Sequence, residues 1–260
     1  MKKVVVFLVC LAACLIGITS WYFIEIFSYS KEYTYFDMPK TKVDSTLTIG
    51  IIGDSWVSKK ALDSLLTHYM NENGISLHIV SSGHPGARTK RIYQNLFEKE
   101  ENINSSKFVI KERPDYCVII AGVNDAASQI GAKNYSYHMT QIIKTLLHYD
   151  IKPVVVSLPE FGIVELTNDI PFPQRFRSNI SAYFNNNKEI DNIVTYRNVL
   201  NEELISNGLI NSILTVNFDN VCNDYSQHLN LYRNDSHLSK EGNQKLAKEI
   251  SNVICNDIIK

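Results

Sequence analysis

The sequence lacks a clear excess of charge of either sign. Its 260 residues carry 26 Lys and Arg against 27 Asp and Glu, a formal net charge of -1. Proteins that bind nucleic acid as their main partner need a basic surface, because phosphate neutralisation dominates their affinity. We therefore expect no nucleic-acid partner. The chain is 45% hydrophobic and 20% charged, which excludes a disordered or coiled-coil protein.

Cysteine is scarce, with five residues in the chain. Cys10 and Cys14 lie in an N-terminal apolar run, and Cys117 lies inside an apolar stretch typical of the core, which leaves Cys222 and Cys255 as a candidate bridge. These are too few for a disulfide scaffold. No His, Cys, Asp or Glu cluster has the spacing of metal ligands, so we expect no metal and no cofactor.

A long apolar run is present at the N-terminus. Lys2 and Lys3 precede residues 4–24, which carry no charge and are long enough to span a bilayer as a helix. Two lysines before the run favour a cytoplasmic N-terminus. A cleaved secretory signal and a lipoprotein box at residues 11–14 are rival interpretations. All three place the rest of the chain outside the cytoplasm, and we expect a membrane-anchored protein of the bacterial periplasm or cell surface.

Three parts of the chain are expected from this pattern. Residues 1–27 form the anchor or signal segment, residues 28–45 a stalk, and residues 46–260 one large domain with ample core. The sequence contains no internal repeat and no low-complexity tract that would divide the domain.

Short apolar runs alternate with helix-like segments through the domain. Because the strand runs are continuously apolar, we expect both faces of the sheet to be covered by helices. Alternating strands and helices predict a parallel sheet in a three-layer α/β/α sandwich. The expected strands are 47–52, 77–80, 116–120 and 153–158, and the expected helices lie near 59–73, 90–100, 137–149, 176–187 and 239–256. Residues 159–177 are expected to be a long functional loop.

Polar residues follow the predicted strands, where ligands bind in an open parallel sheet. They include a serine, amide donors and a late Asp and His, which together are the groups that acyl transfer requires. The segments are residues 53–56 (Gly-Asp-Ser-Trp), 81–89, 122–125 (Gly-Val-Asn-Asp) and 234–238 (Asn-Asp-Ser-His-Leu).

The chemistry suggests a role for each of these residues. Ser55 needs an imidazole to accept its proton, and His237 is the candidate base. Asp235 is expected to orient that imidazole because it is close in sequence. The amides of Ser55 and Gly86 and the side chain of Asn124 are expected to form the oxyanion hole. Four neighbouring residues are expected to contact substrate: Asp54, Trp56, His84 and Arg88.

This set of segments resembles the blocks of the SGNH (GDSL-like) hydrolase superfamily. Residues 52–55, 83–89, 121–125 and 235–242 resemble its blocks, so the likeness runs from about residue 47 to 255. It implies the flavodoxin-like SGNH hydrolase fold, Ser55 as nucleophile, Gly86 (with Gly83 as its rival) and Asn124 in the oxyanion hole, and His237 as base. One departure stands out, because Asn234 occupies the position of the family's acid, three residues before His237. Either Asp235 reaches the imidazole, or an amide or carbonyl orients it.

The resemblance implies a serine esterase, and an exported domain favours acetylated carbohydrate as its substrate. One alternative is an O-acetyltransferase acting on an envelope or secreted polysaccharide with a membrane-bound acyl donor partner. Another is a non-catalytic glycan-binding module. Arginines near the expected site would meet an acidic sugar if the loop 159–177 folds over it: Arg88, Arg91, Arg175 and Arg177.

Overall fold

The computed structural model describes residues 27–38, 46–98 and 104–259, together with positions 7, 10, 11, 13, 14, 17 and 20. Among these residues, no helix is both long and apolar enough to cross a membrane. Most of the expected span, residues 4–24, lies outside the described residues.

A five-stranded parallel sheet forms the middle layer, in the order β2-β1-β3-β4-β5. Its β-branched side chains are buried on both faces, as in Ile51, Val118 and Val154, because helices cover the sheet on each side. The strands are β1 (Leu47–Gly53), β2 (Leu77–Gly83), β3 (Tyr116–Ile120), β4 (Lys152–Val156) and β5 (Leu214–Val216).

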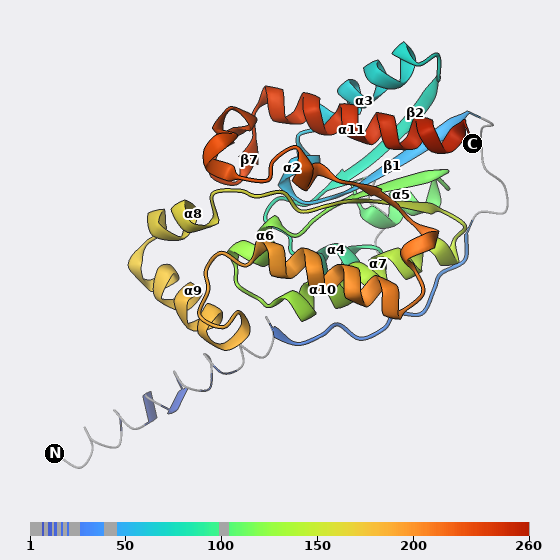
Figure 1. The fold of residues 1–260 in the computed structure, drawn as a ribbon. Helices are drawn as coiled ribbons and strands as arrows, with labels where there is room; N and C mark the ends of the chain where they lie inside the picture. The colour runs from blue at the N-terminus through green and yellow to red at the C-terminus, as the bar shows by residue number, and fades with distance from the viewer. Residues whose placement is uncertain are drawn as a thin grey trace.

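Helices cover both faces of this sheet (Figure 1). One layer contains α3 (Ala61–Glu72) and the C-terminal α11 (Lys240–Ile258), which pack against each other. The opposite layer contains α4 (Thr89–Asn95), α5 (Ser106–Lys111), α7 (Ala132–His148) and α10 (Ile193–Ser206). The predicted three-layer α/β/α sandwich is therefore confirmed.

Shorter elements complete the chain. A two-stranded antiparallel hairpin, β6 (Tyr232–Asn234) and β7 (His237–Leu238), precedes α11. The remaining elements are α2 (Ser55–Ser58), α6 (Val123–Ala127), α8 (Ile163–Asp169), α9 (Phe172–Asn185), η1 (Ile210–Ser212), η2 (Phe218–Asn220), η3 (Tyr225–Gln227) and η4 (Leu229–Leu231).

The prediction of a long irregular loop at residues 159–177 is wrong. This region contains α8 and the start of α9. Pro171 precedes α9 and Pro173 is its second residue, where proline is tolerated because the first amides of a helix have no intrahelical partner. The prolines that suggested a loop therefore mark the beginning of a helix.

The described part of the expected stalk, residues 28–38, lies along α4 and α7. The amide of Ser30 donates to His138 Nε2 at 3.1 Å, and the amide of Phe36 donates to the Tyr149 hydroxyl at 2.8 Å. Tyr33 stacks on Phe97 with ring centroids 4.9 Å apart. These contacts hold the segment against the sandwich.

The candidate disulfide is absent from the described structure, in which Cys222 and Cys255 are free and buried. The Cys222 thiol donates to the Glu160 carbonyl at 3.1 Å. The Cys255 thiol instead lies 3.5 Å from Met70 Sδ. The two thiols therefore belong to different contacts, as does Cys117, which is buried in β3.

Candidate active site

The first site segment follows β1. Asp54 caps α2, its Oδ1 accepting the Trp56 amide at 2.9 Å, and Ser55 is the first residue of that helix. Gly53 is needed here for steric reasons, because a Cβ atom would lie 2.2 Å from the Ile120 carbonyl oxygen of the neighbouring strand. The tight turn thus places Ser55 at the carboxyl end of the sheet.

The glycine segment follows β2, which is in register with β1 so that Gly83 pairs with Gly53. A Cβ at Gly83 would lie 2.2 Å from the Ser58 amide nitrogen, whereas Gly86 has a φ of +73° and open space where its Cβ would be. Gly83 is therefore required by the close approach of α2. Gly86 instead lies in an exposed turn closed by a hydrogen bond from the Ala87 amide to the His84 carbonyl, and its positive φ favours glycine.

Asn124 connects these two segments. Its Nδ2 donates to the Ala87 carbonyl at 3.0 Å and lies 3.3 Å from Asp54 Oδ2. The Ala87 carbonyl can only accept, so it fixes the amide nitrogen on this side. The expected oxyanion donor is thus engaged in holding the glycine turn, and it would have to exchange a bond to meet an oxyanion.

His237 lies in the β6–β7 hairpin and is paired with Asn234. The side-chain Oδ1 of Asn234 accepts the His237 amide at 2.9 Å and lies 3.0 Å from His237 Nδ1. Because Oδ1 also accepts a second amide, that of Ser236 at 3.3 Å, this atom must be the oxygen. His237 Nδ1 therefore carries the proton, and Nε2 keeps its lone pair for use as a base.

The expected pairing of Asp235 with His237 is not what the structure contains. Asp235 Oδ1 accepts the Tyr225 hydroxyl at 2.9 Å, and the Asp235 carbonyl accepts the Gly162 amide at 2.8 Å. The hairpin turn sends residue 235 toward α8 while residue 234 faces the imidazole. The alternative left open by the sequence, in which an amide orients the histidine, matches this geometry.

Ser55 and His237 line one pocket of about 300 Å³. The indole nitrogen of Trp56 donates to the Ser236 carbonyl at 2.8 Å, which joins α2 to the β6–β7 hairpin. Within the described residues no hydrogen bond joins the Ser55 hydroxyl to the imidazole. Such contacts are often long until a substrate is bound. The other lining residues are Lys59, Ala61, Arg233, Leu238, Ser239, Lys240 and Asn243.

Burial shifts the pKa of several groups at this edge. Desolvation lowers the pKa of His237, and the positive charges of Arg233 and Lys59 lower it further. Desolvation also raises the pKa of Asp54 to about 7 and that of Asp125 to about 6. The imidazole is therefore neutral near pH 7, as a general base must be.

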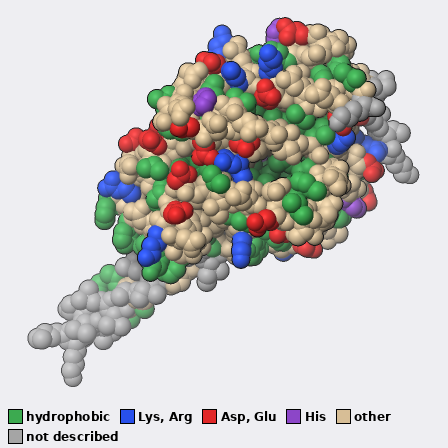
Figure 2. Space-filling view, in the orientation of Figure 1, with side chains coloured by type: hydrophobic (Ala, Val, Ile, Leu, Met, Phe, Trp, Pro, Cys, Tyr) green, Lys and Arg blue, Asp and Glu red, His purple; other side chains and the backbone are tan. Residues whose placement is uncertain are grey.

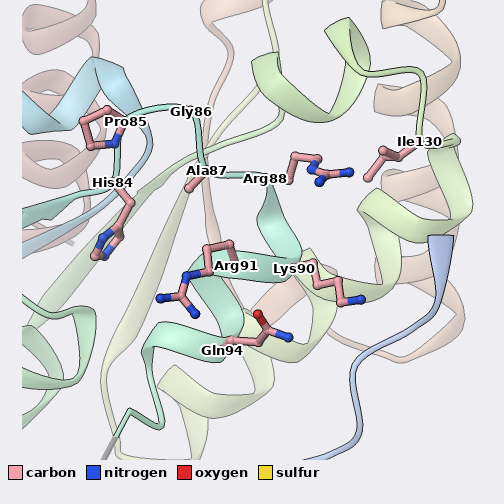
Figure 3. Close-up of a pocket in the computed structure, with 9 residues that line it drawn as sticks. All are labelled: His84, Pro85, Gly86, Ala87, Arg88, Lys90, Arg91, Gln94 and Ile130. Atoms are coloured by element: carbon pink, nitrogen blue, oxygen red, sulfur yellow. The ribbon is translucent and has the colours of Figure 1, made fainter. Parts of the chain in front are cut away.

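The residues expected to contact substrate divide into two groups. Asp54 is buried beneath Ser55 and serves as a helix cap, which leaves it no surface for substrate. Trp56 lines the pocket that contains Ser55. His84 and Arg88 line a second pocket of about 510 Å³ beside Gly86 (Figure 3).

Sequence reasoning missed the lining cations Lys59, Arg233 and Lys240. Their only signal is position, because each lies within four residues of a site residue. Among the residues that the structure describes, no three His, Cys, Asp or Glu side chains come together in a way that could hold a metal ion.

Comparison with known proteins finds no matching family model and no matching curated protein. Solved structures do match. A putative lipolytic protein of the G-D-S-L family from Desulfitobacterium hafniense is 15% identical, with a TM-score of 0.55 over 80% of this chain and 99% of that one. The esterase EstA from Pseudoalteromonas sp. is 13% identical, with a TM-score of 0.56 over 82% and 99%.

The acetylxylan esterase Axe2 from Geobacillus stearothermophilus also matches, at 16% identity, with a TM-score of 0.53 over 82% of this chain and 96% of that one. At these identities the matches establish the fold. The chain has the α/β architecture of the GDSL and SGNH-like lipases and esterases.

Proposed function

We propose that this protein is a serine esterase that removes acetyl groups from carbohydrate through an acyl-Ser55 intermediate. One observation carries the proposal: Ser55 shares a pocket with a histidine whose Nδ1 proton is fixed by Asn234, so that Nε2 can accept a proton. The similarity in fold to solved lipases and esterases supports the reaction class, and the likeness to an acetylxylan esterase supports the substrate.

The reaction proceeds in two halves. His237 Nε2 takes the proton of the Ser55 hydroxyl as its Oγ attacks the acyl carbon, and the amides of Ser55 and Gly86 stabilise the oxyanion. The tetrahedral intermediate expels the sugar oxygen, which receives the proton from His237. Water then attacks acyl-Ser55 with His237 again acting as base, releasing acetate and restoring the serine.

An amide in place of the acid constrains the mechanism. In a serine protease whose triad aspartate is replaced by asparagine, turnover falls about 10⁴-fold because the imidazole takes the wrong tautomer. Here two backbone amides hold Asn234 Oδ1 toward the ring, so the tautomer is the productive one. What the amide cannot supply is a full negative charge beside the imidazolium.

The proposal is tested by hydrolysis of p-nitrophenyl acetate and of acetylated xylo-oligosaccharides by the full chain in detergent. Ser55→Ala should reduce turnover by about 10⁴-fold or more, and Ser58→Ala, on the same short helix, is the matched control. Activity that survives Ser55→Ala would refute the nucleophile. Longer-chain esters measured alongside would reveal a lipid substrate if they were preferred over acetate.

For localisation, we propose that residues 4–24 anchor the chain in a membrane with the esterase outside the cytoplasm. The support is the uncharged run behind Lys2 and Lys3. External protease added to spheroplasts, which lack an intact outer envelope, should degrade the exported part. Complete protection that disappears on cell lysis would overturn the proposal.

A further inference from the structure

Two pockets lie at the residues proposed for catalysis, since Gly86 lines one of them and Ser55 and His237 line the other. The pocket of Ser55 and His237 lies beside β1 and the β6–β7 hairpin, and the pocket of His84 and Arg88 lies beside α4. The turn that contains Gly86 is tied to the strand that precedes Ser55, because the His84 amide donates to the Gly53 carbonyl at 2.9 Å. A chain molecule with its ester at Ser55 would therefore extend toward both pockets.

Both pockets are lined by cations. Lys59, Arg233 and Lys240 line the first pocket. Arg88, Lys90 and Arg91 line the second, where they extend from the glycine turn and the first turn of α4 (Figure 3). Within the described part of the chain, no Asp or Glu lines either pocket.

Three carboxylates around the lining residues are paired or buried. Glu98 pairs with Arg91, its Oε1 lying 2.8 Å from Arg91 Nη2. Asp54 and Asp125 are fully covered below the site. Among the described residues, the cations of each pocket therefore share its lining with no carboxylate.

This one-sided charge is local. The chain as a whole has nearly equal numbers of acids and bases, and Figure 2 shows side chains of both signs interspersed over one face of the molecule. A cleft lined by one sign of charge concentrates ligands of the opposite sign.

Building on the proposed esterase function, we propose that the substrate is an anionic chain, a glycan or polyol with carboxylate or phosphate groups on both sides of the ester-bearing unit. Arg88 is placed to bind an anionic group beside Gly86, and Lys240 binds one beyond His237. Guanidinium and ammonium groups suit carboxylate and phosphate equally, so the shared chemistry is the repeated negative charge.

Binding without turnover tests this substrate class. The full chain in detergent is titrated by calorimetry with three polymers that carry no acetyl group: polygalacturonate, poly(glycerol phosphate) and neutral xylan. We expect one or both anionic polymers to bind at least tenfold more tightly than xylan, with an affinity that falls as salt is raised from about 50 to about 300 mM. The preferred anionic polymer identifies carboxylate or phosphate as the ligand.

Charge-removing variants locate the site. Arg88→Gln and Lys240→Gln should each weaken anionic binding about two- to fivefold, and the double variant by about the product. Lys248→Gln removes an exposed charge elsewhere on α11 and should leave binding unchanged. Equal binding of xylan, no binding of any polymer, or full binding by the double variant would each overturn the proposal.

The outcome is separable from that of the esterase proposal. Ser55-dependent hydrolysis of p-nitrophenyl acetate without any preference for anionic polymers would retain the esterase and overturn the anionic substrate. Anionic binding that is lost in the double variant, without Ser55-dependent hydrolysis, would retain the pockets and overturn the esterase.

Discussion

At the residue scale, the catalytic proposal depends on which side chain orients His237. Asn234 Oδ1 lies 3.0 Å from Nδ1, whereas Asp235 accepts a hydrogen bond from Tyr225. Asn234→Ala should therefore lower kcat for p-nitrophenyl acetate by about 10²-fold or more with little change in KM, because a loss of orientation acts on the transition state.

The matched control is Asp235→Asn, which keeps an acceptor for the Tyr225 hydroxyl and removes the charge. It should leave kcat within about twofold. A loss in Asp235→Asn as large as that in Asn234→Ala would show that Asp235 reaches the imidazole during the reaction, and the assignment to Asn234 would then be wrong.

A second residue-scale prediction concerns pH. Burial, Arg233 and Lys59 lower the pKa of His237, and the base acts only when neutral, so kcat/KM should fall as the pH drops through that lowered pKa. Asn234→Asp places a negative charge beside the ring, which favours the imidazolium. The acid limb of the pH-rate profile should then move to higher pH by about one unit. An unchanged limb would mean that residue 234 does not contact the catalytic imidazole.

The sequence predicted the site residues that follow strands and missed those set by the hairpin. Ser55 could be named because residues that follow parallel strands meet at one edge of the sheet. His237, which shares its pocket, could be named because a serine nucleophile needs an imidazole as its base. The exchange of roles between Asn234 and Asp235 could not be predicted. It depends on the geometry of the turn between β6 and β7, and β7 is only two residues long. Sequence proximity alone gives no direction for a side chain in such a turn.

At the scale of elements, continuous apolar runs were a sufficient signal for the first four strands. The third strand was predicted with its observed bounds, Tyr116–Ile120. The edge strand β5 was not separated from its surroundings, since Leu214–Val216 is only three residues long. A strand of that length is specified by its neighbour β4 rather than by its own sequence.

The pattern of apolar residues in helix α9 does not follow its buried face. Its buried face consists of small residues, Ser178, Ser181 and Ala182, whereas Phe176 and Phe184 are exposed. Apolar periodicity predicts which side of a helix faces the core, and here the large aromatic residues are on the outer side. The helix was therefore predicted four residues short at its start, although its existence was predicted correctly.

An element-scale prediction concerns the segment 27–38 on α7. His138 Nδ1 lies 2.8 Å from the Asn134 carbonyl, which can only accept, so Nε2 is left to accept the Ser30 amide. Burial lowers the pKa of His138 to about 4. The neutral imidazole stabilises the docked segment through this hydrogen bond. This stabilisation is complete above the unfolded pKa of about 6.5 and is lost as the pH falls through about 4.

Hydrogen exchange of the Ser30 amide measures this directly. Its protection factor should fall about tenfold or more between pH 7 and pH 4, since a lost buried hydrogen bond is worth roughly 1–3 kcal/mol. His138→Gln retains an acceptor without a titrating group, so its protection should be insensitive to pH. Acid sensitivity that persists in His138→Gln would assign the effect to another group.

At the scale of the whole molecule, composition and local charge give different information. A net charge of -1 agrees with the face shown in Figure 2, on which side chains of both signs are mixed. The cationic pockets could not be predicted from it, because Lys59, Arg88 and Arg233 come from distant parts of the chain. Only the sheet topology brings those parts to one edge.

Global stability should carry a pH dependence from the two carboxylates buried beneath that edge. Asp54 and Asp125 have pKa values raised to about 7 and about 6, chiefly by desolvation, against an ordinary value of 3.8. A carboxyl group whose pKa is raised in the folded protein favours its protonated form there. Its contribution is therefore complete below about pH 4 and is lost as the pH rises through the folded value.

A comparison of Asp54→Asn with the native chain isolates the pH-dependent contribution of Asp54 to the free energy of unfolding. Asparagine keeps an acceptor for the Trp56 amide and loses the one for Asn124, a loss that does not depend on pH. The free energy of unfolding of the variant relative to the native chain should therefore rise by about 2 kcal/mol between pH 5 and pH 8, as measured by urea denaturation. Because His138 is present in both proteins, its opposite pH dependence cancels in the difference. A difference that stays constant with pH would mean that Asp54 is ionised in the folded protein throughout this range, and the positive pockets above it would then be its compensating charge.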